Sequence, residues 1–120
     1  MNEQQARTAE PGPETDRAVA EWMGDATEMR CPDDYRGRMA AKAPRKYSTS
    51  AEHAMSALKA LAETMPGFYL EPMRIDQWHV AIPPMGNVSW DAVLAPTPEL
   101  AIARAVLVLK ARGVTREGLS

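Results

Sequence analysis

The sequence predicts an α+β fold, a layered sandwich of three helices on a three-stranded antiparallel sheet, in the order α-α-β-β-β-α. Two observations support this prediction. Apolar residues recur every three or four positions over 49–65 and are dense over 98–110, as in helices. Between these stretches, residues 68–95 hold three short segments rich in aromatic and branched residues and separated by turn-forming residues.

Length and periodicity predict one small domain with irregular ends. Residues 1–13 are polar, contain two prolines and a glycine and show no hydrophobic period, so we expect a disordered leader. The ordered domain is predicted to span 14–112, and 113–120 to be a flexible tail. Within the domain, 25–46 has no sustained period and predicts a long loop, and loops of more than about 12–15 residues are often functional or disordered.

The first two helices have recognisable start and stop signals. Thr15 and Asp16 are candidate N-caps for a short first helix, and Gly24 can close it in the left-handed conformation. In the central helix Thr49 is the expected N-cap, and Glu52 three residues later completes a capping-box pattern. A Pro-Gly pair at 66–67 ends that helix.

Signals of the same kind mark the last helix. Thr97 is the expected N-cap, and Pro98 occupies the first helical position, where its missing N–H costs nothing. The segment 100–109 is apolar around most of the helix circumference, so more than one of its sides must be covered. This helix therefore either packs between the sheet and another helix or carries a self-association surface.

The three strand segments are 68–75, 78–82 and 88–95. Pro72 cannot donate to a ladder of hydrogen bonds, which places the first strand at a sheet edge. Short connections imply an antiparallel meander, because parallel neighbours need a crossover of about a dozen residues. His79 is expected on the face opposite Trp78. The aromatic side chains of the sheet are assigned to the face that the helices cover, although a stacking platform for bases built from Tyr69, Trp78 and Trp90 is an alternative.

Several short motifs stand in a familiar order. Trp22-Met23-Gly24 ends the first helix, Tyr47-Ser48-Thr49 opens the central one, Trp78 lies in a strand, and TPELAIARAVL begins the last helix. Over residues 16–111 this order resembles the phage ABA sandwich domain family, small proteins of phages and prophages. The resemblance implies layered helices and a small antiparallel sheet, and it brings no catalytic residues.

Composition excludes several classes of protein. The formal net charge is −2, whereas binding through phosphate neutralisation usually needs a basic domain. The lone Cys31 cannot form an internal disulfide, which favours a reducing compartment, and we expect the host cell cytoplasm. No run of 18 apolar residues is present, so we expect no membrane span.

The sequence offers no catalytic constellation. Cys31, His53 and His79 are the soft metal-ligand candidates, and none has a partner at a ligating spacing, so no metal site is expected. Glycine-rich phosphate loops, nucleophile elbows and paired-carboxylate signatures are also missing from the sequence. We therefore expect neither an enzyme nor a bound cofactor.

Candidate binding residues lie in the long loop and in the second strand. They are Arg36, Arg38, Lys42, Arg45, Lys46 and His79. A run of cations without interleaved aromatics is also typical of solvated surface. Two functions stay open. The first is a non-catalytic phage- or prophage-derived accessory protein that binds a host or phage macromolecule or itself. The alternative is a nucleic-acid or nucleotide-binding module that uses the basic residues of 36–46 and the sheet aromatics.

Overall fold

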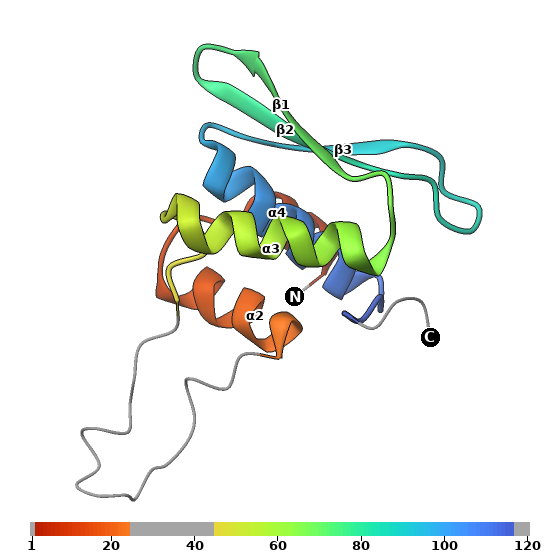
Figure 1. The fold of residues 1–120 in the computed structure, drawn as a ribbon, viewed down its shortest axis with the longest axis horizontal. Coiled ribbons are helices and arrows are strands. Elements are labelled where there is room, and N and C mark those ends of the chain that lie inside the picture. Colours follow the sequence, from red (N-terminus) through yellow and green to blue (C-terminus); the bar gives the residue numbers. More distant parts are fainter. Residues whose placement is uncertain (1, 25–44, 117–120) are drawn as a thin grey trace, which may run out of the picture.

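The computed structural model describes residues 2–24 and 45–116 (Figure 1). Its elements are α1 (Glu3–Arg7), α2 (Pro13–Met23), α3 (Ala51–Thr64), β1 (Tyr69–Arg74), β2 (Gln77–Ile82), β3 (Asp91–Ala95) and α4 (Pro98–Ala111). The predicted α+β class and the antiparallel three-stranded sheet, in the order β1-β2-β3, are confirmed. The described residues form four helices rather than three, because α1 was not predicted.

Helix α4 lies at the centre of the molecule. All three strands contact it, and so do α1, α2 and α3 (Figure 1). Nine of its 14 residues are buried, and they lie all around its circumference between Leu100 and Leu109. Of the two placements that the sequence allowed for this helix, the structure shows the first, between the sheet and other helices. Its apolar surface is therefore occupied within the chain.

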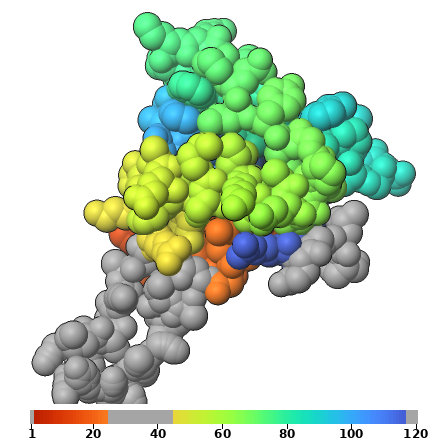
Figure 2. Space-filling view, in the orientation of Figure 1, coloured from red at the N-terminus to blue at the C-terminus, as the bar shows by residue number. Residues whose placement is uncertain are grey.

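The strand register assigns each sheet residue to a face. Val80 of β2 lies opposite Leu70 of β1 and Val93 of β3, and all three side chains pack into the core beside α4. Side chains alternate between the two faces along a strand, so the neighbouring residues His79 and Leu94 point away from α4. The two hairpin ends of the sheet project beyond the helices (Figure 2).

Both edges of the sheet are poor templates for an added strand. Along β3, the carbonyls of Ala92 and Leu94 accept hydrogen bonds from Arg7 Nη1 at 3.1 Å and Arg104 Nη1 at 3.0 Å. Alternate residues of an edge strand turn these groups away from the sheet, so the two guanidinium groups occupy acceptors that a new strand would need. On β1, Pro72 lacks an N–H and a register irregularity follows it. The predicted edge position of β1 is confirmed.

The prediction of a disordered leader over 1–13 is wrong for the described residues. Asn2 and Gln5 form a reciprocal capping box at the start of α1, and Ala6 is fully buried in the core. Helix α2 begins at Pro13. The missing hydrophobic period was misleading, because charged side chains rather than an apolar stripe hold α1 in place.

Four charged residues from distant parts of the chain form one ionic cluster. Glu3 and Arg7 come from α1, Asp91 begins β3, and Arg112 follows α4. Arg7 Nη2 lies 3.0 Å from Glu3 Oε2 and 2.5 Å from Asp91 Oδ2. Arg112 Nη2 lies 2.9 Å and 2.7 Å from the same two oxygens. Each carboxylate therefore contacts both guanidinium groups, and the cluster joins α1 to the sheet and to the end of α4.

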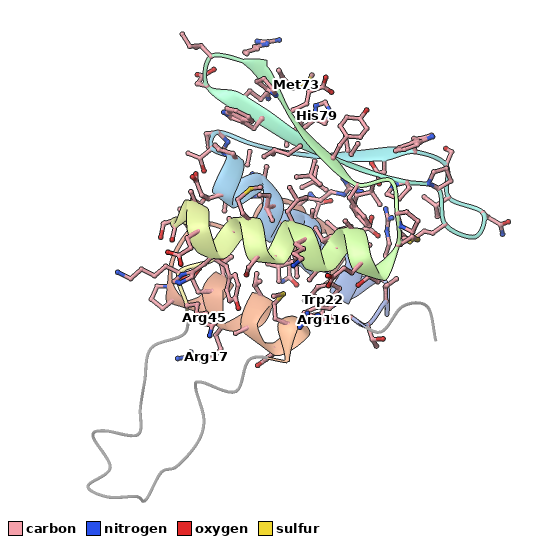
Figure 3. The ribbon with its side chains drawn as sticks, in the orientation of Figure 1. Arg17, Trp22, Arg45, Met73, His79 and Arg116 are labelled. Atoms are coloured by element: carbon pink, nitrogen blue, oxygen red, sulfur yellow. The ribbon has the colours of Figure 1, made fainter. Side chains whose placement is uncertain are left out.

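The predicted flexible tail begins too early. The indole N–H of Trp22 donates to the carbonyl of Val114 at 2.8 Å, and Val114 itself is buried. Arg116 donates to the carbonyl of Met23 at 2.8 Å, and Figure 3 shows its side chain beside Trp22. Residues up to 116 are thus docked on α2, and 117–120 lie outside the described residues.

Helix starts are partly as predicted. Thr97 caps α4, accepting a hydrogen bond from the Leu100 amide at 3.2 Å, and Gly24 closes α2 at a φ of 75°. Thr49 is not the cap of α3, which begins after Ser50 and has no side-chain capping bond. Thr15 and Asp16 are not caps either, because α2 already begins after Gly12.

Asp16 instead anchors the chain before α3. Its carboxylate is buried and accepts two hydrogen bonds from Ser48, from the amide at 2.8 Å and from the hydroxyl at 2.6 Å. The Ser48 hydroxyl oxygen in turn accepts from the Gly12 amide at 3.1 Å. A buried carboxylate needs such partners. This contact therefore fixes α2 to the segment that leads into α3.

We expect the substitution Asp16→Ala to lower the free energy of unfolding by about 2–3 kcal/mol, because it leaves two buried donors of Ser48 without an acceptor. Urea denaturation measures the change. The control is Glu14→Ala, an exposed carboxylate of the same helix, which should change stability by no more than about 0.5 kcal/mol. Equal effects of the two substitutions would contradict the anchoring role of Asp16.

The ionic cluster also makes stability depend on pH. Hydrogen bonds from Arg112, and then from Arg7, lower the pKa of the Glu3 carboxyl. Burial acts to raise the pKa of Asp91, but hydrogen bonds from Arg7, the Ala92 amide and Arg112 outweigh it and the pKa is lowered. A carboxyl whose pKa is lower in the folded than in the unfolded chain stabilises the fold above its unfolded pKa. That stabilisation is lost as the pH falls through the folded value.

Unfolding free energy should therefore decline on acidification below the ordinary pKa values of 4.5 for Glu3 and 3.8 for Asp91. The substitution Arg112→Met should flatten this decline in urea titrations between about pH 6 and pH 3. Arg17→Met, which removes an exposed cation of α2, serves as the control and should keep the original slope. An unchanged slope in the Arg112 variant would show that the cluster does not couple protonation to folding.

Candidate functional site

The face of the sheet that points away from α4 is the candidate site. We call it the outer face and define it by six side chains on β1, on β2 and on the segment from the end of the second hairpin through β3. They are Tyr69, Glu71, Met73, His79, Trp90 and Leu94. Figure 3 shows Met73 next to His79 on the hairpin formed by β1 and β2.

The strand register brings three of these side chains into one row. His79 lies opposite Glu71 on one side and opposite Leu94 on the other. The imidazole Nε2 of His79 is 3.2 Å from the Glu71 carboxylate, and this contact orients the ring. Nδ1 of the same ring is buried without a hydrogen-bond partner in the described part of the chain. The His79 side chain is thus less exposed than those of the outer-face residues that surround it.

Aromatic rings form the next part of the outer face. The Tyr69 ring centroid lies 6.1 Å from that of His79 and 6.3 Å from that of Trp90, with interplanar angles of 62° and 52°. Such tilted and edge-on contacts are favourable for aromatic pairs. Ala81 lies opposite Tyr69 on this face and is buried, although α4 covers only the other face. We attribute its burial to these surrounding rings.

A glycine in the turn before β1 makes this arrangement sterically feasible. Gly67 has a φ of +115°, a conformation that other residues rarely adopt. A Cβ at this position would lie 2.9 Å from Cβ of Pro83 and 3.8 Å from the Trp90 ring. The close approach of the turn to Pro83 therefore requires glycine, and the Trp90 ring fits against the same turn.

Large apolar side chains are exposed mainly on and around the sheet. Of the seven large hydrophobic residues that are exposed in the described residues, six lie between Tyr69 and Leu94. On the outer face the exposed fractions are 48% for Tyr69, 51% for Met73, 56% for Trp90 and 42% for Leu94. The seventh residue, Met55, lies on α3 and is 52% exposed. Scattered single hydrophobic residues are ordinary on a surface, whereas a contiguous group marks an interaction site.

Charges of both signs accompany this apolar group. Glu71 is half exposed, and Arg74 and Asp76 are exposed at the end of the same hairpin. The outer face therefore has no excess of positive charge, which differs from a surface that binds nucleic-acid phosphates.

The three predicted binding residues that the structure describes do not form one surface. Arg45 and Lys46 are exposed just before α3, and Figure 3 shows Arg45 near Arg17, at the end of the molecule opposite His79. The other three, Arg36, Arg38 and Lys42, lie outside the described residues. His79 belongs to the outer face.

Sequence reasoning also placed two aromatic residues on the wrong side of the sheet. Trp78 packs against the core as predicted, but Tyr69 and Trp90 lie on the outer face and are about half exposed. The alternation of strand residues contained the signal for Tyr69, because Leu70 is its core-facing neighbour.

The described residues contain no group of three His, Cys, Asp or Glu side chains that could hold a metal ion. Cys31 falls outside them. His53 accepts a hydrogen bond from the Lys46 amide at 3.1 Å on Nδ1, so its role is local. No helix within 2–24 or 45–116 has the length and apolar character needed to cross a membrane.

A surface hollow of about 600 Å³ lies at the connection between α1 and α2. Glu10 and Glu14 are the charged side chains of its lining, and both are exposed. The Gly12 amide in this lining already donates to Ser48. The hollow therefore lacks converging polar groups that would orient a ligand, and the outer face is the better candidate.

Comparison with known proteins adds no assignment, since the chain matches no family model, no curated protein and no solved structure. The resemblance to the phage ABA sandwich domain family stays a prediction from the sequence motifs.

Removing an outer-face side chain should affect stability far less than removing a core one. Trp22→Ala should lower the free energy of unfolding by about 3–5 kcal/mol, because the ring is buried and its N–H binds Val114. Trp90→Ala should lower it by only about 1 kcal/mol, since more than half of the residue's surface is exposed. Urea denaturation of both variants tests this difference. A large loss in the Trp90 variant would make this ring part of the structural core.

Proposed function

We propose that this chain is a non-catalytic accessory protein of phage or prophage origin that acts by binding a protein partner through the outer face. The observation that supports binding is the concentration of exposed large apolar side chains on one face of the sheet, around Tyr69, Trp90 and Leu94. The proposed phage origin has a different basis, the resemblance of the sequence motifs.

Protein is a better partner than nucleic acid for this surface. The nucleic-acid alternative combines the basic residues of 36–46 with the sheet aromatics. Of those basic residues the structure describes Arg45 and Lys46, and Arg45 lies at the end of the molecule opposite His79 of the sheet (Figure 3). Bases can stack on exposed rings, but a stacking platform normally works together with a positively charged groove. Around the outer face Glu71 and Asp76 offset the charge of Arg74. Aromatic and methionine side chains with mixed charges are instead typical of protein interfaces.

Strand addition at an edge is a less favourable mode of binding. Arg7 and Arg104 occupy carbonyls of β3, and Pro72 interrupts β1. A partner would gain few backbone hydrogen bonds at either edge. The proposed contact is therefore made by side chains of the outer face.

Site-specific photocrosslinking tests this function. A photoreactive phenylalanine analogue replaces Trp90 in one variant and Met55 in a matched control, and both are expressed in host cells and irradiated. Both positions are about half exposed, but only Trp90 belongs to the outer face. We expect a discrete protein adduct from the Trp90 position and none from the Met55 position. Equal adducts at both positions, or none at either, would contradict the proposal.

The same cells also test the alternative function. An adduct that nuclease treatment removes, together with purified protein whose affinity for single-stranded DNA falls steeply with salt, would favour nucleic-acid binding instead. We expect adducts that resist nuclease and no binding to single strands at low salt.

A further inference from the structure

We infer that the partner of the outer face is a second copy of this chain, so that two sheets pack face to face in a symmetric dimer. This inference rests on the proposed function, because it names the occupant of the same surface. Area, charge and the state of the sheet edges support it separately.

The exposed apolar area is of the size that a dimer interface needs. Large side chains have about 150–250 Å² of surface each, so the half-exposed Tyr69, Met73, Trp90 and Leu94 together offer on the order of 400 Å². A standard interface takes about 800 Å² from each partner, of which roughly 500 Å² is apolar. Ile75 and Val88, which lie in the connections on either side of β2, are also exposed. The outer face can therefore supply the apolar centre of one interface.

The charges on and beside the outer face suit a second copy. In a two-fold symmetric dimer the same patch lies on both sides of the interface. Charges of opposite sign can therefore meet across the interface only if the patch itself carries both signs. Glu71 and Asp76 are negative and Arg74 is positive, and all three are exposed on the β1–β2 hairpin. A patch of one sign would repel its own copy. A patch that carries both signs can pair with itself.

Both edges of the sheet are blocked to strand addition, so association through the outer face is favoured over association through an edge. Because guanidinium groups occupy β3 carbonyls and Pro72 interrupts β1, copies cannot readily join edge to edge into a continuous sheet. Two sheets that pack face to face lie about 10 Å apart and bury the side chains between them. The helices of each copy would then lie on the side of its sheet that is turned away from the interface. Such an interface is closed and does not propagate into fibres.

Sedimentation equilibrium of the full-length protein tests the inference. We expect the wild type to have twice the monomer mass of 13.2 kDa at micromolar concentration and to dissociate on dilution. Leu94→Glu should raise the dimer dissociation constant by on the order of 100-fold or more, because each copy brings an unpaired charge into the interface. Met55→Glu, which places the same charge on α3, should leave the dissociation constant unchanged. Circular dichroism and urea unfolding check that both variants are folded, and Met73→Glu replaces Leu94→Glu if the latter is not.

Each outcome decides the inference. A wild type that stays monomeric at every concentration would overturn it, and so would a dimer that tolerates a folded Leu94→Glu or Met73→Glu variant. The mass of the photocrosslinked adduct shows whether only the dimer is wrong or whether the proposed function is wrong as well. A monomer that gives an outer-face adduct with another protein keeps the function and removes the second copy as its partner. A monomer without any adduct removes both.

Discussion

The fold depends on the enclosure of one apolar helix. Helix α4 buries side chains on all of its sides, and it can do so only if the sheet covers one side while α1, α2 and α3 cover the rest. A small domain buries only a modest area on folding, and enclosing one apolar helix on all sides concentrates that burial in a single core. Every other element of the described structure contacts α4. The order of the elements matters less than this shared contact.

Polar contacts then join the elements that surround α4 to one another. Asp16 joins α2 to Ser48 before α3, and the ionic cluster joins α1 to β3 and to the end of α4. These contacts stabilise differently. The Asp16 carboxylate is buried, so the loss of either partner leaves an unsatisfied group in the interior. The ionic cluster is partly exposed and depends on protonation, so α1 is held most firmly at neutral pH.

All helices lie on one side of the sheet in the described structure, and this arrangement produces the candidate site. A sheet with one covered face exposes the other, and here that face carries Tyr69, Met73, Trp90 and Leu94 instead of a purely polar set. His79 and Glu71 supply a polar pair within it. A solvated sheet would be expected to place polar residues at these positions. A partner that covers the outer face would account for its apolar side chains.

The sequence by itself determined the elements and their class. Periodicity, the Thr97 cap, the Gly24 stop and Pro72 as an edge marker are local signals, and they predicted α3, α4, most of α2 and the antiparallel meander correctly. Tertiary structure alone decided the rest. Helix α1 is held by Arg112 from the far end of the chain. Asp16 joins α2 to the segment before α3 because Ser48 lies beside it in the folded chain. The exposure of Tyr69 and Trp90 depends on which face α4 covers. Contacts between residues distant in sequence leave no local pattern. Strand alternation indicated the face of Tyr69 and the sequence singled out His79, but the exposure of the assembled outer face could not be predicted from the sequence.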